Sequence, residues 1–403
     1  MWRHRDLRVV GPARALSVLG DEMALVALLL RVHDTGGGDT GVALLLASAA
    51  LPTVLLSPWA GRLADRYDSR RLATGSALGQ FAACAALAYT TTPWLVYLLV
   101  ALLQVGQAVA NPTWGALLPR IVGETDIARA QGGMSALLTV GAVCGPALGG
   151  LLTGLGGPRL PLLVDAATFA GLAAAGLAVR TRRGGHFSEP AGAHPPQPRA
   201  LDGFRLLAHD AILGPVFAAL MCYIVVGEAT NVVEVFLVRD ALHGTAAQYG
   251  LIGMVAGAGI VIGSLLGGRD TTLAGRVRWI VLAAAAQALM LSLAGLAPSV
   301  VVLAVAWLLM GLANGILNTC TSTLLMTRTP EATRGQVIAA ATGAARGFSI
   351  GALLVGGLAG AVLGPRVTFV LAGACALVVA GALAWTMRGS AAARTDTVIA
   401  RTG

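Results

Sequence analysis

The sequence is short of charge: it contains no lysine, and Asp, Glu and Arg together make up only 12% of its 403 residues. A soluble globular domain carries roughly 25% charged residues, which keep its surface in contact with water. Hydrophobic residues reach 56% here, which is more apolar surface than a soluble fold of this length can bury. This shortage excludes a soluble protein and predicts an integral membrane protein whose surroundings are the lipid bilayer.

Paired cysteines are lacking as well. All five cysteines fall inside apolar runs, and no two of them have the C-x-x-C spacing of a zinc or redox site. His33, Asp34 and Asp39 surround a Gly-rich loop, but this grouping does not favour metal binding. We therefore expect no disulfide framework, no metal site and no cofactor.

The patterns of soluble enzymes and nucleic-acid-binding domains are also missing. The runs GAGIVIG (257–263) and GFSIG (347–351) imitate a dinucleotide-binding turn and a nucleophile elbow, but both lie inside apolar segments without a preceding strand. The net charge of +9 comes from arginines in short loops rather than from one basic face. We expect neither an enzyme nor a nucleic-acid-binding protein.

Apolar segments of about 20 residues recur along the whole chain, and each is long enough to cross a bilayer as a helix. Glycine and proline mark the breaks between them. The predicted spans are 12–32, 40–60, 72–91, 93–115, 131–155, 159–180, 211–238, 246–267, 277–297, 299–325, 336–361 and 364–387.

The placement of arginine gives these spans a direction. Of the 28 arginines, 22 fall at the two termini or at alternate loops and the span ends beside them, four fall at the remaining loops and adjoining span ends, and Arg14 and Arg346 fall deeper within spans. Cytoplasmic loops carry the excess of basic residues. Both termini are therefore predicted to be cytoplasmic, and the expected location is the cell membrane, crossed many times.

A basic, proline-rich stretch at 181–210 divides six spans from six and is typical of a flexible linker. The loops after the fourth and tenth spans resemble each other, because both place an arginine near the exit and an acid–arginine pair before the next span. Parallel halves of this kind are a transporter architecture. We predict an all-α membrane protein with six-helix bundles at 1–180 and 211–390, a cytoplasmic linker at 181–210 and a disordered cytoplasmic tail at 391–403.

The second span is followed by the run GRLADRYDSRR (61–71). It resembles motif A of the major facilitator superfamily, G-x-L-A-D-R-x-G-R-R, and departs from it at Asp68 and Ser69. The resemblance implies that Asp65 braces a cytoplasmic gate against the start of the eleventh helix, where a carboxylate is favoured. The alternative is a solvated loop that only fixes topology. The gate motif consists of Gly61, Asp65, Arg66, Arg70 and Arg71.

The fifth span contains the run GAVCGPALGG (141–150). It resembles motif C of the same superfamily, which is associated with antiporters. The whole resemblance covers nearly the full chain and implies two pseudo-symmetric six-helix bundles of the drug:proton antiporter (efflux) branch. Physically, the run forms a face of small residues for close helix packing, with a proline that adds a bend. The matching residues are Gly141, Gly145, Pro146, Gly149 and Gly150.

Polar residues at membrane depth gather on the first, fourth, seventh and tenth spans, the helices that line the central cavity in this superfamily. A charged residue at the centre of a span costs roughly 2.5–3.5 kcal/mol, so each is a functional candidate. The candidates for proton coupling are Asp21, Glu22, Glu228 and Glu234. The candidates for lining the cavity and contacting substrate are Arg14, Gln104, Gln107, Asn111, Trp114, Asn231, Trp307, Asn314 and Asn318.

Asp21 is the preferred coupling acid, and its neighbours qualify that choice. Arg14 precedes it by seven residues on the same helix face and competes by holding it ionised, which keeps Glu228 as an alternative. Glu22 points about 100° away, toward a neighbouring helix. Glu234 is either in the cavity or solvated near the outer interface.

These observations predict a secondary active transporter. The expected activity is proton-coupled export of a small amphipathic molecule, a drug or a natural product, by alternating access of a monomer. One alternative is a permease or exporter for a metabolite or siderophore. The other is a membrane receptor that does not transport, which would need neither acids inside its spans nor a gate loop.

Overall fold

The computed structural model consists of helices and turns, and the part of the chain that it describes contains no β-strand. The described residues are 4–123, 126–182, 204–207, 210–269 and 272–402. Eleven helices in these ranges are long and apolar enough to cross a membrane. A twelfth, α1 (Arg5–Asp34), has 30 residues but carries Arg14, Asp21 and Glu22 along its length. Its length suffices for a crossing, so the charges alone set it apart.

The chain folds into two compact units. Unit 1 comprises Met1–His194 and Gly244–Met254, and unit 2 comprises Pro195–His243 and Val255–Gly403. The first part of one helix, α9, therefore belongs to unit 1 although the rest of that helix belongs to unit 2.

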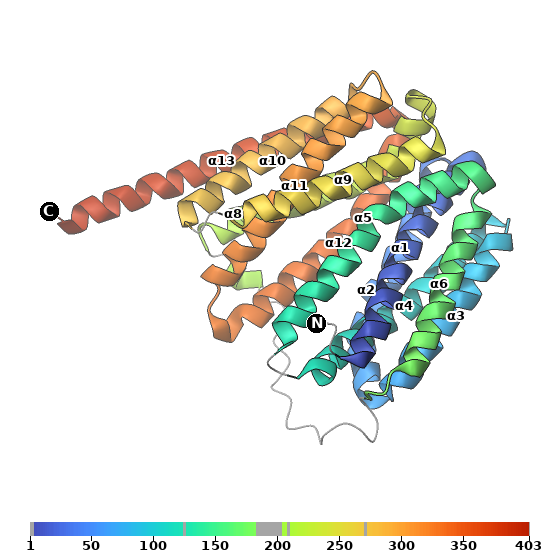
Figure 1. The fold of residues 1–403 in the computed structure, drawn as a ribbon. Helices are drawn as coiled ribbons and strands as arrows, with labels where there is room; N and C mark the ends of the chain where they lie inside the picture. The colour runs from blue at the N-terminus through green and yellow to red at the C-terminus, as the bar shows by residue number, and fades with distance from the viewer. Residues whose placement is uncertain (1–3, 124–125, 183–203, 208–209, 270–271, 403) are drawn as a thin grey trace. The chain divides into compact units, whose positions relative to one another are not determined.

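Each predicted span falls on one helix, and the span at 211–238 also reaches the π-helical turn that continues its helix (Figure 1). The helices of unit 1 are α1, α2 (Gly38–Arg66), α3 (Ser69–Tyr89), α4 (Pro93–Val122), α5 (Ile127–Gly156) and α6 (Arg159–Ala178). The remaining elements are α8 (Leu213–Phe236) with the π-helical turn η3 (Leu237–Ala241), α9 (Ala246–Gly267), α10 (Leu273–Gly295), α11 (Val300–Arg328), α12 (Glu331–Leu363) and α13 (Pro365–Thr402).

Glycine and polar caps set the ends of these helices. Gly123, Gly157 and Gly364 follow α4, α5 and α12 with φ angles of 74°, 70° and 76°, a conformation that glycine adopts without steric cost. The hydroxyl of Ser299 accepts from the N–H of Val302 at the start of α11, over 3.4 Å. The sequence signals for turns thus mark real helix boundaries.

The helices pack in the same order within each unit. In unit 1, α1 packs on α5 and α6, and α3 packs on α4 and α6. In unit 2, α8 packs on α12 and α13, and α10 packs on α11 and α13. Each helix pair of unit 1 therefore has a counterpart pair in unit 2. α2 packs on α4, and the counterpart α9 approaches α11 closely, since a Cβ added at Gly315 would lie 2.6 Å from the backbone nitrogen of Ser264. This internal repeat is the architecture that the sequence predicts.

The second helix is longer than the sequence predicts. The expected loop at 61–71 is helical as far as Arg66, and only Tyr67 and Asp68 separate α2 from α3. Arg62, Leu63, Ala64 and Arg66 are good helix formers, and hydropathy alone does not detect a helix that continues past the membrane. Asp68 then starts α3, because its Oδ1 accepts from the N–H of Arg70 at 2.8 Å.

Two other predicted segments fall partly outside the described residues. Most of the linker at 181–210 lies there, although 204–207 form a helical turn. Where the sequence predicts a disordered tail from 391, α13 continues to Thr402, as the helix propensity of its alanine run at 391–393 allows.

Candidate functional site

Unit 1 contains a cavity of about 240 Å³ between α1, α4 and α5. Its lining includes Arg14, Asn111 and Trp114, three of the residues predicted to contact substrate. Arg14 Nη2 donates to Asn111 Oδ1 over 3.4 Å. The indole Nε1 of Trp114 is buried and has no hydrogen-bond partner in the described part of the chain. Gln131 and Ser135 of α5 add polar groups that the sequence analysis did not select.

Asp21 lies between α1 and α4 rather than on the wall of this cavity. Its Oδ2 accepts from Gln107 Nε2 at 2.7 Å, which joins two of the predicted residues. Its Oδ1 is buried and has no hydrogen-bond partner among the described residues. Arg14 binds Asn111 instead, so within the described ranges no cation neutralises Asp21.

Two further acids lie near Asp21: Glu22 is the next residue of α1, and Asp165 of α6 lies against the preceding residue, Gly20. Glu22 faces α5, because a Cβ added at Gly145 would lie 2.5 Å from the Cβ of Glu22. Gln104 is half-buried on α4 and is not among the residues lining the cavity. Asp165 is fully buried and accepts from the Cys84 thiol at 3.2 Å.

Unit 2 contains a larger cavity of about 500 Å³ between α8, α10, α11 and α12. Four of the predicted residues line it: Glu228, Asn231, Asn314 and Asn318. Both carboxylate oxygens of Glu228 accept hydrogen bonds, Oε1 from the Ser349 hydroxyl at 3.1 Å and Oε2 from Asn231 Nδ2 at 3.3 Å. Asn318 Nδ2 donates to Asn314 Oδ1 at 2.8 Å.

Several polar residues of this cavity are not among the sequence-based candidates, Gln287 and Ser349 among them. Gln287 comes from α10 and Ser349 from α12, which are not among the four helices on which the sequence predicts the cavity lining. The Oε1 of Gln287 is buried without a hydrogen-bond partner among the described residues, as is the hydroxyl of Thr321. A single glutamine in an otherwise apolar span is the signal that could have identified Gln287, whereas Ser349 needs knowledge of helix packing.

Glu234 and Trp307 do not line this cavity. Trp307 is buried, with 4% of its surface exposed, and its Nε1 donates to Glu234 Oε1 at 2.9 Å. Its ring lies 5.5 Å from that of Phe369. The two candidates therefore form a pair of their own, which fills the interior of unit 2 between α8, α11 and α13.

The gate motif is described only in part. Gly61 and Asp65 lie within α2, but the surroundings of the Asp65 side chain are outside what the structure describes. Arg66 and Arg71 are exposed and Arg70 is half-buried. Asp68, the departure from the motif, caps α3 and forms an ion pair with Arg182, Oδ2 to Nη1, at 3.5 Å. This acid ties the α2–α3 connection to the segment that follows α6.

The glycines of the fifth-helix motif lie at close helix contacts. A Cβ added at Gly141 would lie 2.6 Å from the carbonyl oxygen of Ala15, and one at Gly149 would lie 2.8 Å from the Cα of Met23, both on α1. A Cβ at Gly150 would lie 2.9 Å from the Cα of Gly250, in the part of α9 that belongs to unit 1. Small residues allow this approach of backbones in a membrane.

Two acids outside the spans hold the ends of helices. Asp6 accepts from the N–H and hydroxyl of Thr181 at 2.8 and 2.7 Å and from the N–H of Arg180 at 3.1 Å. Burial opposes the charge, but these bonds outweigh it and hold the pKa of Asp6 below its ordinary value. Asp210 caps α8 and binds Arg328 Nη2 at 3.0 Å. Burial is again outweighed, by the cap bonds and Arg328, and the pKa of Asp210 is lowered.

Known proteins resemble the chain over nearly its whole length. The family model described as Major Facilitator Superfamily matches residues 10–237 and 216–399. The Enterobactin exporter EntS of Shigella dysenteriae serotype 1 (strain Sd197) is 30% identical over 90% of this chain and 87% of its own. Macrolide efflux protein A of Streptococcus pyogenes is 26% identical over 34% of this chain and 36% of its own. The solved structure of the nucleoside transporter NupG, 14% identical, aligns with a TM-score of 0.75 over 95% of this chain and 99% of its own, which shows the shared fold.

Proposed function

The chain belongs to the Major Facilitator Superfamily, and we propose that it exports a small amphipathic molecule, a drug or a natural product, in exchange for protons. Transport rather than catalysis is the activity of this family and of the exporters that resemble the chain. The proposal adds the direction, the coupling ion and the class of cargo. In this proposal both termini lie on the cytoplasmic side of the cell membrane, and the protein transports as a monomer.

The observation that carries proton coupling is the environment of Asp21. It lies on a helix long enough to span the membrane, and Gln107 holds one of its oxygens while the other has no partner among the described residues. Acids at membrane depth are expensive and typically serve as proton or substrate sites in transporters. An acid without a paired cation can release and regain a proton without first breaking an ion pair.

The two cavities support an amphipathic cargo. Each combines a few polar groups with mostly apolar walls, the arrangement of small-molecule sites in general. Unit 1 offers a cation, Arg14, beside the Trp114 indole. Unit 2 offers the Glu228 carboxylate, with amides and hydroxyls around it. A cargo with an apolar body and a few polar groups suits either cavity.

Gating belongs to the same proposal. We assign Asp65 the role of bracing the cytoplasmic gate, by the resemblance of its motif. The ion pair between Asp68 and Arg182 supports a second function for this connection. It holds the start of the linker against unit 1, so the linker and the gate motif would move together.

Export of a siderophore is the second candidate. The relative named Enterobactin exporter matches 90% of this chain at 30% identity. The macrolide efflux protein matches only 34% of this chain. Arg14 in the unit 1 cavity would suit the acidic oxygens of such a molecule.

Uptake into inside-out vesicles tests both candidates. The probes are a macrolide and enterobactin, the cargoes named for the relatives, together with tetracycline as a third export probe. We expect accumulation of at least one probe when the vesicle lumen is acidified, and loss of that accumulation when the gradient is collapsed. Accumulation that is independent of the pH gradient would contradict proton coupling. Absence of transport with all three probes would contradict the proposed cargo class.

A further inference from the structure

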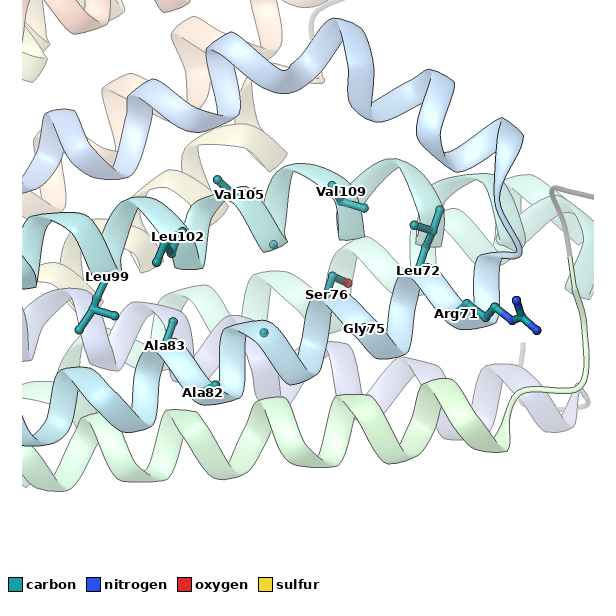
Figure 2. Close-up of a pocket in the computed structure, with 12 residues that line it drawn as sticks. Arg71, Leu72, Gly75, Ser76, Ala82, Ala83, Leu99, Leu102, Val105 and Val109 are labelled. Atoms are coloured by element: carbon teal, nitrogen blue, oxygen red, sulfur yellow. The ribbon is translucent and has the colours of Figure 1, made fainter.

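An apolar groove of about 630 Å³ runs between α3 and α4 on unit 1 (Figure 2). One wall is made by larger side chains of α4, among them Leu102 and Val105. The other wall is made by small residues of α3, including Gly75 and Gly79. Nothing lies within 4 Å of a Cβ added at either glycine. These glycines therefore leave open space and do not serve close helix packing.

The length of the groove matches one leaflet of a bilayer. Its lining on α3 runs from residue 71 to residue 83, which at 1.5 Å per residue is about 18 Å. The hydrocarbon core of a bilayer is about 30 Å thick, so one leaflet contributes about 15 Å. A groove of this length accommodates one acyl chain from its glycerol end to its methyl end.

A single charge stands at one end of the groove. Arg71 is exposed, lies at the end near the start of α3 (Figure 2), and has no ion pair or hydrogen bond with the described residues. The neighbouring acid, Asp68, is already paired with Arg182 at 3.5 Å. The guanidinium is therefore available to an anion at the membrane surface.

A second groove of unit 1 provides an internal comparison. It lies between α1 and α6, has a volume of about 640 Å³, and has similarly apolar walls. No charged side chain is among its lining residues, which include Ala13, Val164 and Gly171. The two grooves differ chiefly in the arginine.

We propose that the α3–α4 groove binds one phospholipid with an anionic headgroup, whose acyl chain lies along Gly75 and Gly79 and whose phosphate is bound by Arg71. Arginine binds phosphate with two parallel hydrogen bonds, and anionic lipids attract basic residues at the membrane surface. By the predicted topology, the lipid comes from the cytoplasmic leaflet. Arg71 thus has a role separate from that of the other gate-motif residues.

Native mass spectrometry of the purified full chain tests this site. The protein is incubated with equal concentrations of phosphatidylglycerol and phosphatidylcholine, and the bound copies of each lipid are counted. We expect the preference for phosphatidylglycerol to fall about fivefold in Arg71→Gln, the contribution of one basic residue near a membrane surface. The matched control is Arg62→Gln, which removes the same charge from an exposed position on α2 outside the groove and should leave the preference unchanged.

A second pair of variants tests the acyl-chain site. Gly79→Leu should fill the groove and remove one bound lipid, and the open space at this glycine means that the side chain fits without disturbing the helices. Gly171→Leu is the control in the second groove, where a Cβ also has nothing within 4 Å. Equal effects of Arg71→Gln and Arg62→Gln would overturn the proposal, because they would indicate a general charge effect. Equal effects of the two leucine variants would overturn it as well.

Discussion

At the scale of single residues, Asp6 shows how a carboxylate can be held by donors from another segment. Three hydrogen bonds from Arg180 and Thr181 favour its charged form. All three donors bind Oδ2, so Asp6→Asn keeps the shape and an acceptor oxygen for them but removes the negative charge. We expect a loss of about 1–3 kcal/mol of stability at neutral pH, measured by thermal unfolding in detergent. Thr181→Ser keeps the hydroxyl and should have little effect.

The pH dependence of this loss has a definite sign. The pKa of Asp6 is lower in the folded protein than the value near 3.9 of an unfolded chain. Its contribution is therefore complete above about pH 4 and disappears as the pH falls through the folded-state pKa. The stability of Asp6→Asn and the parent should converge in acid. A gap that stays constant down to the lowest pH at which the fold survives would mean that charge is not the cause.

Candidate residues could be chosen from the sequence only where a side chain is costly at its position. Asp21, Gln107 and Glu228 were selected because acids and amides are rare in spans, and the structure gives all three hydrogen-bond partners. Asp68 was noted only as a departure from a motif. Its ion pair is formed with Arg182, more than a hundred residues away, so local pattern could not reveal that contact.

At the scale of helices, α5 depends on glycine at some positions and not at others. A Cβ at Gly149 would lie 2.8 Å from the backbone of Met23, whereas nothing lies within 4 Å of one at Gly154, farther along the same helix. Gly149→Ala should destabilise the protein by about 1–3 kcal/mol through overpacking. Gly154→Ala should be neutral or slightly stabilising, because alanine favours helix. Thermal unfolding measures both.

Equal melting temperatures for the two alanine variants would show that α1 and α5 separate easily, contrary to this packing.

Helix positions were predictable because runs of about 20 apolar residues have no alternative in lipid. Helix ends were less predictable, as α2 shows, because a helix can continue into water on propensity and caps alone. The assignment of the start of α9 to unit 1 depends on long-range contacts with Gly150 and has no local signature.

At the scale of the whole molecule, the topology remains a prediction from the arginine distribution. Single cysteines at Gly37 and at Gln197, the latter outside the described residues, are placed in a cysteine-free background. A membrane-impermeant maleimide added to intact cells should label Gly37→Cys and spare Gln197→Cys until the membrane is opened. Labelling of both from outside would show that the linker is not cytoplasmic.

Proton coupling through Asp21 is the central claim, and pH-driven efflux in proteoliposomes containing Asp21→Asn tests it most directly. The amide keeps the size and a hydrogen-bonding group for Gln107 but cannot exchange a proton. Using the probe transported by the parent protein, we expect efflux driven by a pH gradient to fall to the level of empty vesicles while probe binding stays within about twofold. Asp34→Asn, at the exposed end of the same helix, should transport as the parent does. Normal pH-driven efflux by Asp21→Asn would contradict the account.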